Sequence, residues 1–548
     1  MKETASPSSR LLRGAFILVL AAILSKLIGT IQKIPLQNIG GDGVFGIYNA
    51  VYPFYTLVLL VATAGFPAAV SKFVAEEMAS GREAGARRVL RISSMMLVVL
   101  GVLFGVLMYV AAPLLAAWID NMHTEAALRS AALALPLVPI MAGLRGYFQG
   151  MHDMMPTAVS QVAEQTVRVA AMVALLLWLH QLGAADDWIA AGATFGSAAG
   201  GAAGLLVMLI YWWLYRRRTR LAAIQVQVEQ APVQHQPAWP LLKALLLYAL
   251  PICLGSLSAP LISLVDTFTM PRLLKASGWS EAEAMIQFGV YNRGIPLVQM
   301  MSMLATSMSV LFIPALADAR IRDRHDLIRS QTQQTVNWFW LLGLASSAGI
   351  AMLAMPVDIM LYEDAIGSDT IRWLAFTGIG ATLSIVTAAL LQGMGSVRAP
   401  AIHLLLATIV KAVLNIVLVP HYGINGAAIA GIVAYSLAAL LNIILLIRLT
   451  QFPVSWREMV WKPLLVTIVM CAGVGVWQWL MDWLLPALGM HARLEALIVT
   501  LGGIAIGGIL FLIGLFRTQL MTEQQAAALP KIGSRLVPWL NKLRIIKK

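Results

Sequence analysis

Long apolar runs recur along the whole chain, and they constrain its fold more than any other feature of the sequence. A helix needs about 20 mostly apolar residues to cross a bilayer, and backbone N–H and C=O groups cannot stay unpaired in lipid. We therefore predict one membrane-spanning helix in each run. The fourteen predicted helices are 11–34, 44–70, 90–117, 125–149, 155–180, 187–215, 240–270, 288–315, 332–356, 371–394, 400–420, 424–449, 459–485 and 493–517.

The composition supports a membrane protein. Of the 548 residues, 59% are hydrophobic and 12% are charged, which is about half the charged share of a soluble domain. Soluble, disordered, fibrous and secreted disulfide-rich classes are therefore excluded. Cys253 and Cys471 both lie inside apolar runs, so we expect neither a disulfide framework nor a zinc site. The predicted fold class is an all-α polytopic membrane protein, and 11–34 is its first span rather than a cleaved signal.

Basic residues gather in alternate loops and at the end of the chain. Lys and Arg are frequent within 72–91, 216–220, 320–329 and 517–548, whereas 181–188 and 357–370 carry Asp or Glu and no Lys or Arg. Because cytoplasmic loops carry the excess of Lys and Arg, we predict that both termini are cytoplasmic. The net charge of +13 is assigned to these loops and not to nucleic-acid binding.

The chain also repeats itself at an offset of 243 residues. This offset pairs Phe45-Gly46-Ile47-Tyr48-Asn49 with Phe288-Gly289-Val290-Tyr291-Asn292, Pro53 with Pro296, Gln149-Gly150-Met151 with Gln392-Gly393-Met394, and Arg168 with Lys411. Six helices per repeat give two halves of the same orientation, an arrangement typical of transporters that rock two lobes about a central site.

The predicted division follows from this duplication. It comprises an N-terminal lobe at 1–220 with six helices, a cytoplasmic linker at 221–238, a C-terminal lobe at 239–450 with six helices, two further helices at 451–520, and a basic cytoplasmic tail at 521–548.

Signatures of enzymes are missing from the sequence. It contains no G-x-x-x-x-G-K-[ST] phosphate loop and no H-E-x-x-H motif, and its eight histidines have no ligand spacing. We therefore expect a transporter without ATPase activity, metal or cofactor, with coupling to the membrane potential or to a monovalent cation.

Polar and ionisable residues inside the predicted spans are the candidate site, because each charge costs about 2.5–3.5 kcal/mol at a helix centre. The predicted diphosphate-binding residues are Lys26, Gln32, Lys33, Arg168 and Arg293, and the predicted polar or coupling residues of the cavity are Glu164, Asp266, Lys411 and Asn415. A cavity lined mainly by bases suits an anionic substrate such as a diphosphate.

Three structural interpretations stay open at this point. Lys33, Arg272 and Arg293 are close enough to helix ends to extend their charges to the interface. Glu164 and Arg168 are four residues apart and can neutralise each other. The small-residue ridge formed by Gly192, Gly196, Gly200 and Gly204 predicts close packing between helices.

Several motifs resemble the stage V sporulation protein B and YtgP group of the multidrug/oligosaccharidyl-lipid/polysaccharide (MOP) flippase superfamily, which includes the MurJ lipid II flippases. The motifs are Phe66-Pro67-Ala68-Ala69-Val70-Ser71-Lys72, Tyr291-Asn292-Arg293-Gly294, Leu391-Gln392-Gly393-Met394-Gly395 and Tyr422-Gly423-Ile424-Asn425-Gly426. The resemblance covers nearly the whole chain. It implies two six-helix lobes, a lipid-carrying groove near the last two helices, and movement of undecaprenyl-diphosphate-linked peptidoglycan precursor to the outer leaflet.

The resemblance also assigns residues. Ser25-Lys26 with Gly29 resembles a helix-1 motif in which an essential Arg follows Ser, so Lys26 keeps the charge and loses the bidentate fork. A second Arg of that motif falls on Gln32, with Lys33 adjacent, and Arg293 resembles an essential Arg of the eighth helix. Some relatives hold a sodium ion near helices 7 and 11, where Lys411, close to Asp266 and Asn415, would serve as a tethered cation.

The resulting hypothesis is a lipid II flippase of the bacterial cytoplasmic membrane that works by alternating access. Its expected partners are a lipid-linked oligosaccharide, membrane lipids and the cell-wall synthesis machinery. One alternative is a flippase for another polyprenyl-linked polysaccharide unit. Others are a drug/cation antiporter of the same superfamily, which would need a cavity rich in carboxylates, and a membrane-embedded glycosyl- or acyltransferase.

Overall fold

A computed structural model describes residues 7–63, 65–225, 238–256, 258–453 and 455–521. Every regular element among these residues is helical. The chain forms two compact units that divide between Gly289 and Val290. The predicted basic tail lies outside the described residues apart from its first position, as does most of the predicted linker.

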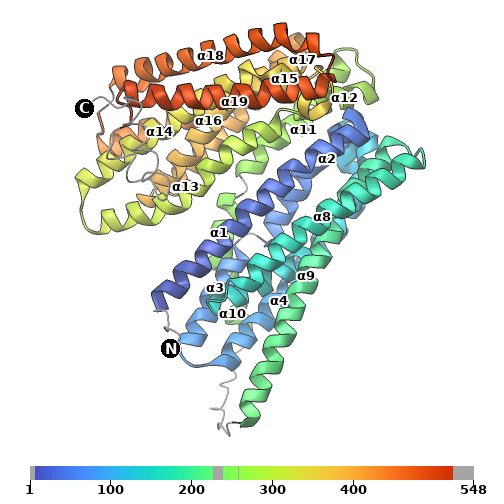
Figure 1. Cartoon of the computed structure of the whole chain (residues 1–548). Coiled ribbons are helices and arrows are strands. Elements are labelled where there is room, and N and C mark those ends of the chain that lie inside the picture. Colours follow the sequence, from blue (N-terminus) through green and yellow to red (C-terminus); the bar gives the residue numbers. More distant parts are fainter. Residues whose placement is uncertain (1–6, 64, 226–237, 257, 454, 522–548) are drawn as a thin grey trace. The chain divides into compact units, whose positions relative to one another are not determined.

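The described residues of the first unit form eleven α-helices, one short 3-10 helix and most of a twelfth α-helix. Figure 1 shows their arrangement along the chain. They are α1 (Pro7–Ile31), α2 (Lys33–Thr63), α3 (Phe66–Ala79), α4 (Glu83–Val110), α5 (Ala112–Ile119), η1 (Met122–Thr124), α6 (Glu125–Ala132), α7 (Leu137–Gly150), α8 (Met155–Gln181), α9 (Asp186–Gln225), α10 (Ala238–Ser256), α11 (Ser258–Ala276) and α12 (Glu281–Asn292).

The second unit begins within α12, and its described part contains seven further α-helices. They are α13 (Ile295–Ile321), α14 (His325–Met352), α15 (Ala354–Tyr362), α16 (Ser368–Gly393), α17 (Arg398–Thr450), α18 (Lys462–Leu484) and α19 (Ala492–Arg517), with the short helices η2 (Arg457–Trp461) and η3 (Pro486–Leu488) beside α18.

Proline accounts for several breaks inside the predicted spans. Pro67, Pro113 and Pro296 lie in the first turns of α3, α5 and α13, where a missing N–H costs no helical hydrogen bond. Each therefore ends the preceding helix and starts a new one. The two predicted helices at 400–420 and 424–449 both lie within α17, where the non-helical residue Gly423, with a φ of 56°, separates them.

Ten helical segments among the described residues are long and apolar enough to cross a membrane. Two of them, Phe16–Ala79 and Arg398–Thr450, each contain two of the predicted helices, so the ten segments account for twelve of the fourteen. The predicted helices at 240–270 and 288–315 fall on the α10–α11 and α12–α13 pairs. The exact number of spans and the duplication remain predictions.

The first unit has its core where α3, α4, α7, α9 and α10 meet. Tyr147 of α7 lies edge-on to Trp212 of α9, with ring centroids 5.2 Å apart, and Val70 and Leu97 are fully buried beside it. The structure places α10 and α11 in this unit, whereas the duplication assigns residues 239–289 to the C-terminal lobe. Phe268 of α11 packs edge-on against Phe54 of α2, with centroids 4.9 Å apart.

The second unit is built around α16, which packs against α13, α14 and α17. Val386 and Leu390 of α16 are fully buried, together with Val336 of α14 and Leu446 of α17. Helices α18 and α19 lie side by side (Figure 1), and their outer faces carry exposed apolar residues such as Leu465 and Ile504.

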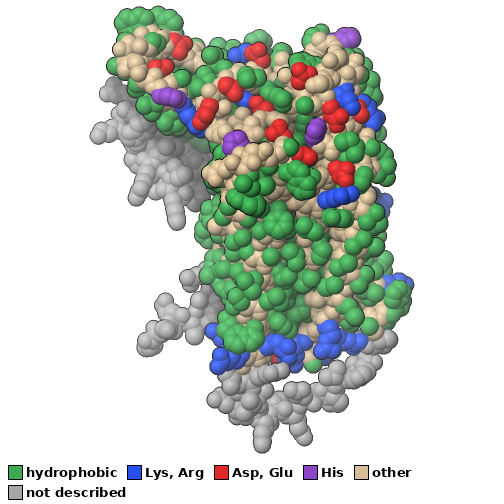
Figure 2. All heavy atoms as spheres, turned by 90° about the vertical axis from the view of Figure 1, so that its right-hand side faces the viewer, with side chains coloured by type: hydrophobic (Ala, Val, Ile, Leu, Met, Phe, Trp, Pro, Cys, Tyr) green, Lys and Arg blue, Asp and Glu red, His purple; other side chains and the backbone are tan. Residues whose placement is uncertain are grey.

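The charges on α9 are separated along the helix. Asp186 and Asp187 lie at its beginning, and Arg216, Arg217 and Arg218 follow the apolar stretch. Figure 2 shows, on the face it displays, a band of hydrophobic side chains with Lys and Arg along one edge and a mixture of Asp, Glu, Lys, Arg and His beyond the other. This arrangement is the one expected of helices that cross a bilayer, and the predicted cytoplasmic placement of the termini remains a prediction.

Candidate functional site

A cluster of polar side chains lies inside the first unit, where α1 and α2 meet α8. Residue Gln32 separates α1 from α2, and its Nε2 donates to the Tyr48 hydroxyl at 3.3 Å. Arg168 of α8 donates from Nη2 to the same hydroxyl at 3.5 Å. Its guanidinium also lies over the ring of Tyr52, 5.2 Å from the centroid. We call Gln32, Tyr48, Tyr52 and Arg168 the Arg168 cluster.

This cluster contains positive charge that no carboxylate neutralises. Arg168 is 8% exposed, and no Asp or Glu of the described residues forms an ion pair with it. The neighbouring Lys33 is 6% exposed, and the described part of the chain supplies no hydrogen-bond or ion-pair partner for its ammonium group. The buried Oε1 of Gln32 is also without a partner there. Two buried cations therefore have no carboxylate paired with them among the described residues.

Glu164 has a partner that the sequence analysis missed. Its carboxylate accepts from Nη2 of Arg145 on α7 at 2.9 Å, and both side chains are 16% exposed. Arg145 also donates to the Ser160 hydroxyl at 2.8 Å. Glu164 is thus ion-paired to Arg145 and not to Arg168. Arg145 is an ionisable residue inside a predicted span, so the criterion used for the other candidates would have found it.

Close packing between α8 and α9 fixes the backbone that carries Arg168. A Cβ atom built on Gly200 of α9 would lie 2.6 Å from the Glu164 carbonyl oxygen and 2.7 Å from Cβ of Arg168. At Gly196 it would lie 2.7 Å from the Arg168 carbonyl oxygen. The prediction that this glycine ridge serves helix packing is confirmed at these positions.

Lys26 lies outside the cluster in this conformation. The preceding residue, Ser25, directs its hydroxyl to the carbonyl oxygen of Gln161 on α8 at 3.4 Å, so Ser25 occupies the buried face of α1. Lys26 is exposed, and its ammonium group has no polar partner among the described residues. Its role in substrate binding stays a prediction.

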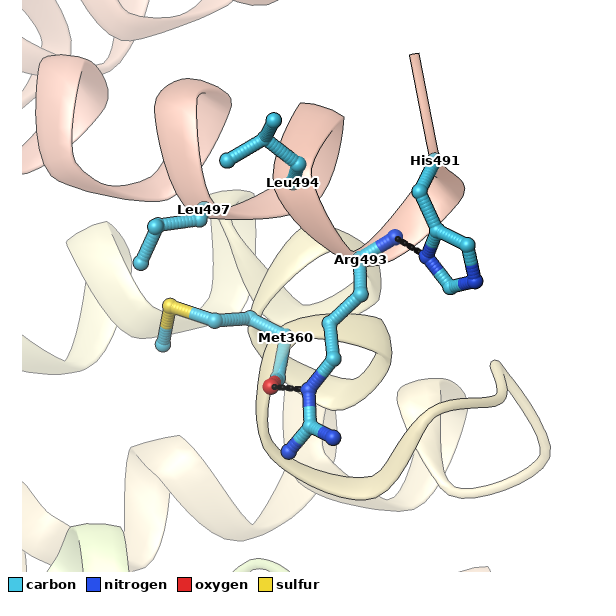
Figure 3. Close-up of a pocket in the computed structure, with 5 residues that line it drawn as sticks. All are labelled: Met360, His491, Arg493, Leu494 and Leu497. Carbon is cyan, nitrogen blue, oxygen red and sulfur yellow. Dashed lines mark hydrogen bonds between the residues drawn. The ribbon is translucent and has the colours of Figure 1, made fainter.

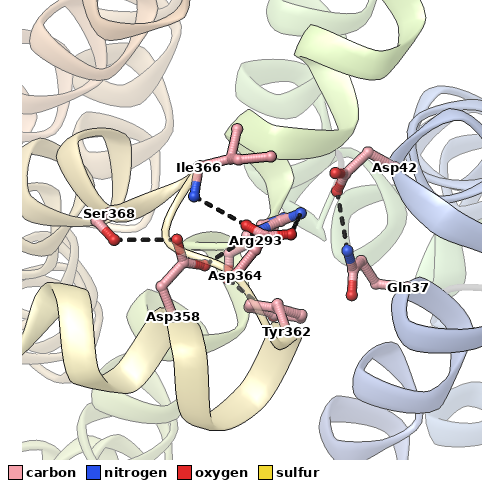
Figure 4. A network of polar contacts seen from close by, with 8 residues as sticks. All are labelled: Gln37, Asp42, Arg293, Asp358, Tyr362, Asp364, Ile366 and Ser368. Atoms are coloured by element: carbon pink, nitrogen blue, oxygen red, sulfur yellow. Dashed lines mark hydrogen bonds and ion pairs between the residues drawn. The ribbon is translucent and has the colours of Figure 1, made fainter. Parts of the chain in front are cut away.

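Arg293 is already bound by protein carboxylates (Figure 4). Its Nη1 lies 2.6 Å from Asp364 and 3.3 Å from Asp358, and its Nη2 lies 2.9 Å from the other oxygen of Asp364. The side chain is completely buried. The structure therefore separates Arg293 chemically from Arg168 and Lys33, because only Arg293 has its charge neutralised.

The two aspartates differ in how readily they ionise, and both lie outside the candidate spans. Burial raises the pKa of Asp358 to about 6, against the opposing effect of Arg293 and the Ser368 hydroxyl. Although partial burial also acts on Asp364, hydrogen bonds from Arg293 and the Ile366 N–H hold its pKa below the usual value. Asp364 is therefore the better-matched partner of the guanidinium.

The predicted coupling residues are buried but divided between the two units. Asp266 of α11 is 5% exposed, and Lys411 and Asn415 of α17 are 3% and 0% exposed. None of the three lacks an interaction partner. Their predicted proximity stays a prediction, as does the cation that Lys411 is expected to replace. The described residues contain no group of three or more His, Cys, Asp or Glu that could hold a metal ion.

A hollow of about 330 Å³ in the second unit is lined by Met360, His491, Arg493, Leu494 and Leu497 (Figure 3). Arg493 uses its Nε to donate to the Met360 carbonyl oxygen at 3.0 Å and pairs through Nη1 with Glu363. The lining is otherwise mostly apolar, and it contains none of the candidate residues from the sequence.

Similarity to known proteins identifies the family. Residues 11–320 match the model of the polysaccharide biosynthesis protein family. The chain is 32% identical to the uncharacterized membrane protein YabM of Bacillus subtilis (strain 168) over 97% of this chain and 96% of that protein. It is 28% identical to the lipid II flippase MurJ of the same organism, over 92% and 95% of the two chains.

The fold has a counterpart among solved structures. A lipid II flippase MurJ in an inward closed conformation matches with a TM-score of 0.61 and 13% identity, covering 92% of this chain and all of the other. The predicted resemblance is confirmed: this chain is a multi-pass membrane protein that belongs to the polysaccharide biosynthesis protein family of the MOP flippase superfamily.

Proposed function

We propose that this protein moves lipid II, the undecaprenyl-diphosphate-linked precursor of peptidoglycan, across the bacterial cytoplasmic membrane by alternating access. Two observations support the proposal. The sequence resembles a lipid II flippase over nearly its full length, and Arg168 and Lys33 are buried in a spanning region without carboxylate partners. The buried cations are the stronger support, because they bear on the charge of the cargo.

An anionic ligand would compensate this buried charge. Removing a cation from water costs several kcal/mol unless a partner replaces the lost hydration. A diphosphate offers oxygen atoms that accept charge-assisted hydrogen bonds, and a guanidinium presents its donors as a rigid fork that matches them. We assign diphosphate contact to Arg168 and Lys33, with the amide of Gln32 as a neutral donor and with Lys26 joining as the lobes move.

The Arg145–Glu164 pair supports an anionic cargo in another way. If Glu164 neutralised Arg168, the site would carry less net positive charge and would suit a neutral or cationic substrate better. Arg145 instead holds Glu164 at 2.9 Å, which leaves Arg168 available. A drug/cation antiporter, which needs exposed carboxylates in its cavity, is therefore the weaker candidate.

The cycle needs no ATP in this proposal. The sugar-peptide head group occupies the cavity while the polyprenyl chain stays in the bilayer. The membrane potential resets the empty carrier, since moving one charge through 100 mV is worth about 2.3 kcal/mol. Lys411, as a tethered cation, makes the reset independent of sodium. Strictly sodium-dependent transport by the unaltered protein would refute this part of the proposal.

The test is lipid II exposure on the outer leaflet of bacterial cells depleted of their own lipid II flippase. We expect this protein to restore exposure, and Arg168→Gln to abolish the restoration at equal membrane abundance. Arg372→Gln is the matched control, because Arg372 is 52% exposed and lies in the second unit. No restoration by a correctly inserted protein would exclude lipid II. Another polyprenyl-linked saccharide, assayed in the same way, would then be the cargo.

A further inference from the structure

Arg293 lies at a break in the backbone, and the break follows from the sequence. Pro296 has no N–H to donate to the carbonyl oxygen one turn earlier, so α12 ends at Asn292 and α13 starts at Ile295. The amides of Leu297 and Val298 both donate to the Gly294 carbonyl oxygen, at 3.2 and 3.3 Å. The Leu297 amide, which in an unbroken helix donates to the Arg293 carbonyl oxygen, thus donates to Gly294.

A side chain from another helix donates to the Arg293 carbonyl oxygen. The Tyr362 hydroxyl, at the end of α15, donates to the Arg293 carbonyl oxygen at 3.0 Å. The ring of the same tyrosine faces the guanidinium, and its centroid lies 5.3 Å from Cζ of Arg293. Tyr362 thus contacts both the backbone carbonyl oxygen and the side chain of Arg293.

The loop between α15 and α16 completes the enclosure. Asp364 binds both terminal nitrogens of Arg293, and its Oδ1 also accepts from the Ile366 N–H at 2.8 Å. Asp358 accepts from Arg293 and from the Ser368 hydroxyl, which lies 3.1 Å away. A Cβ atom on Gly367 would lie 3.0 Å from Cδ of Arg293. The loop is therefore folded closely around the guanidinium.

We infer that Arg293 is a positioning residue and not a ligand of the transported anion. Its two aspartates and Tyr362 bind it so that the break between α12 and α13 is fixed to the α15–α16 loop. The bend sets the direction of α13, which packs along α16 in the core of the second unit. This assignment differs from the role that the sequence predicts for Arg293, and it holds whichever lipid-linked saccharide is carried.

The carboxylates are the reason for preferring this role. A diphosphate would have to displace Asp364 from a bidentate contact and leave a carboxylate at a half-buried position without its partner. It would also have to separate Arg293 from Asp358, and breaking that completely buried pair is costly because the remaining charge keeps no compensation. Among the described residues, Arg168 contacts Tyr48 and Tyr52 and pairs with no carboxylate, so it presents no such obstacle.

The experiment is a double-mutant cycle on the purified full-length protein in detergent, with thermal unfolding as the readout. We expect Arg293→Gln to lower Tm by roughly 2–5 °C and Asp364→Asn to lower it by less, because the Asp364 side chain is 38% exposed. The double variant should lower Tm no further than the more harmful single change. Fully additive shifts, or an unchanged Tm in Arg293→Gln, would overturn the assignment.

A milder variant keeps the test decisive if Arg293→Gln does not fold. Tyr362→Phe removes one hydroxyl and should lower Tm by roughly 1–3 °C. Tyr422→Phe is the control and should leave Tm unchanged, because Tyr422 is 60% exposed. An unaltered Tm in Tyr362→Phe would contradict the inference.

Binding of undecaprenyl diphosphate to the same samples separates the two roles. If Arg293 only positions the backbone, folded Asp364→Asn and Tyr362→Phe lose little affinity, and so does Arg293→Gln where it folds. A ligand role predicts an affinity loss of about 10–100-fold in Arg293→Gln with no loss in Asp364→Asn. Wild-type protein that binds no diphosphate would refute the proposed cargo and leave the Tm cycle valid.

Discussion

The contact between α8 and α9 can be tested by adding a single methyl group. In Gly200→Ala the new Cβ would lie 2.6 Å from the Glu164 carbonyl oxygen and 2.7 Å from Cβ of Arg168, where ordinary contact begins at 3.4 Å. Helix α9 would have to move by about 0.8 Å to restore contact distance. Overpacking of this kind costs about 1–3 kcal/mol.

The matched control is Gly508→Ala on α19, where a Cβ atom meets nothing within 4 Å. Both variants exchange a helical glycine for alanine, so the gain in helix propensity cancels in their comparison. We expect Gly200→Ala to unfold about 1–3 °C below Gly508→Ala in detergent.

The same displacement would act on function. Since one of the crowded atoms is Cβ of Arg168, Gly200→Ala should also reduce transport, whereas Gly508→Ala should not. Equal Tm values for the two variants would refute the packing argument. A lower Tm with unchanged transport would refute the link between this contact and the position of Arg168.

Three further predictions concern charges. Lys33→Gln should raise Tm while lowering transport, because it removes a buried cation without a partner among the described residues. The control Lys243→Gln, on the exposed face of α10, should change neither Tm nor transport. A lower Tm in Lys33→Gln would contradict this prediction. Glu164→Gln and Arg145→Gln should each lower Tm, and the double variant should lower Tm no further than either single change. Additive losses of Tm would show that the ion pair contributes nothing to stability. Because the pKa of Asp358 is raised to about 6, the folded protein binds this proton more readily than the unfolded chain, so the stability from this group falls as pH rises from about 4 to about 6. Asp358→Asn should remove that slope from Tm measured over this range, and an unchanged slope would refute the assignment.

The positions of the helices could be predicted from the sequence because apolar runs of sufficient length have one stable form in lipid. The breaks were less predictable. Pro67, Pro113 and Pro296 each permit either a kink or the start of a new helix, and tertiary contacts such as that from Tyr362 decide between them.

The candidate site was predictable as a set of residues and not as a set of contacts. Arg168 and Lys33 stand out because charge is rare in apolar spans. The partner of Glu164 is Arg145, which lies 19 residues away on a different helix, α7. The i, i+4 spacing within one helix suggests Arg168 as the partner and cannot reveal a contact between two helices. The acidic residues 357–370 entered the sequence argument only as orientation signals, and their contact with Arg293 depends on how α15 folds back.

The central claim is that Arg168 binds the diphosphate of a lipid-linked saccharide. Its most direct test is the affinity of the purified protein for lipid II, measured for the wild type, Arg168→Gln and the control Arg372→Gln. The account predicts that Arg168→Gln weakens binding by about 10–100-fold while Arg372→Gln binds as the wild type does. Equal affinities for all three proteins would contradict the claim.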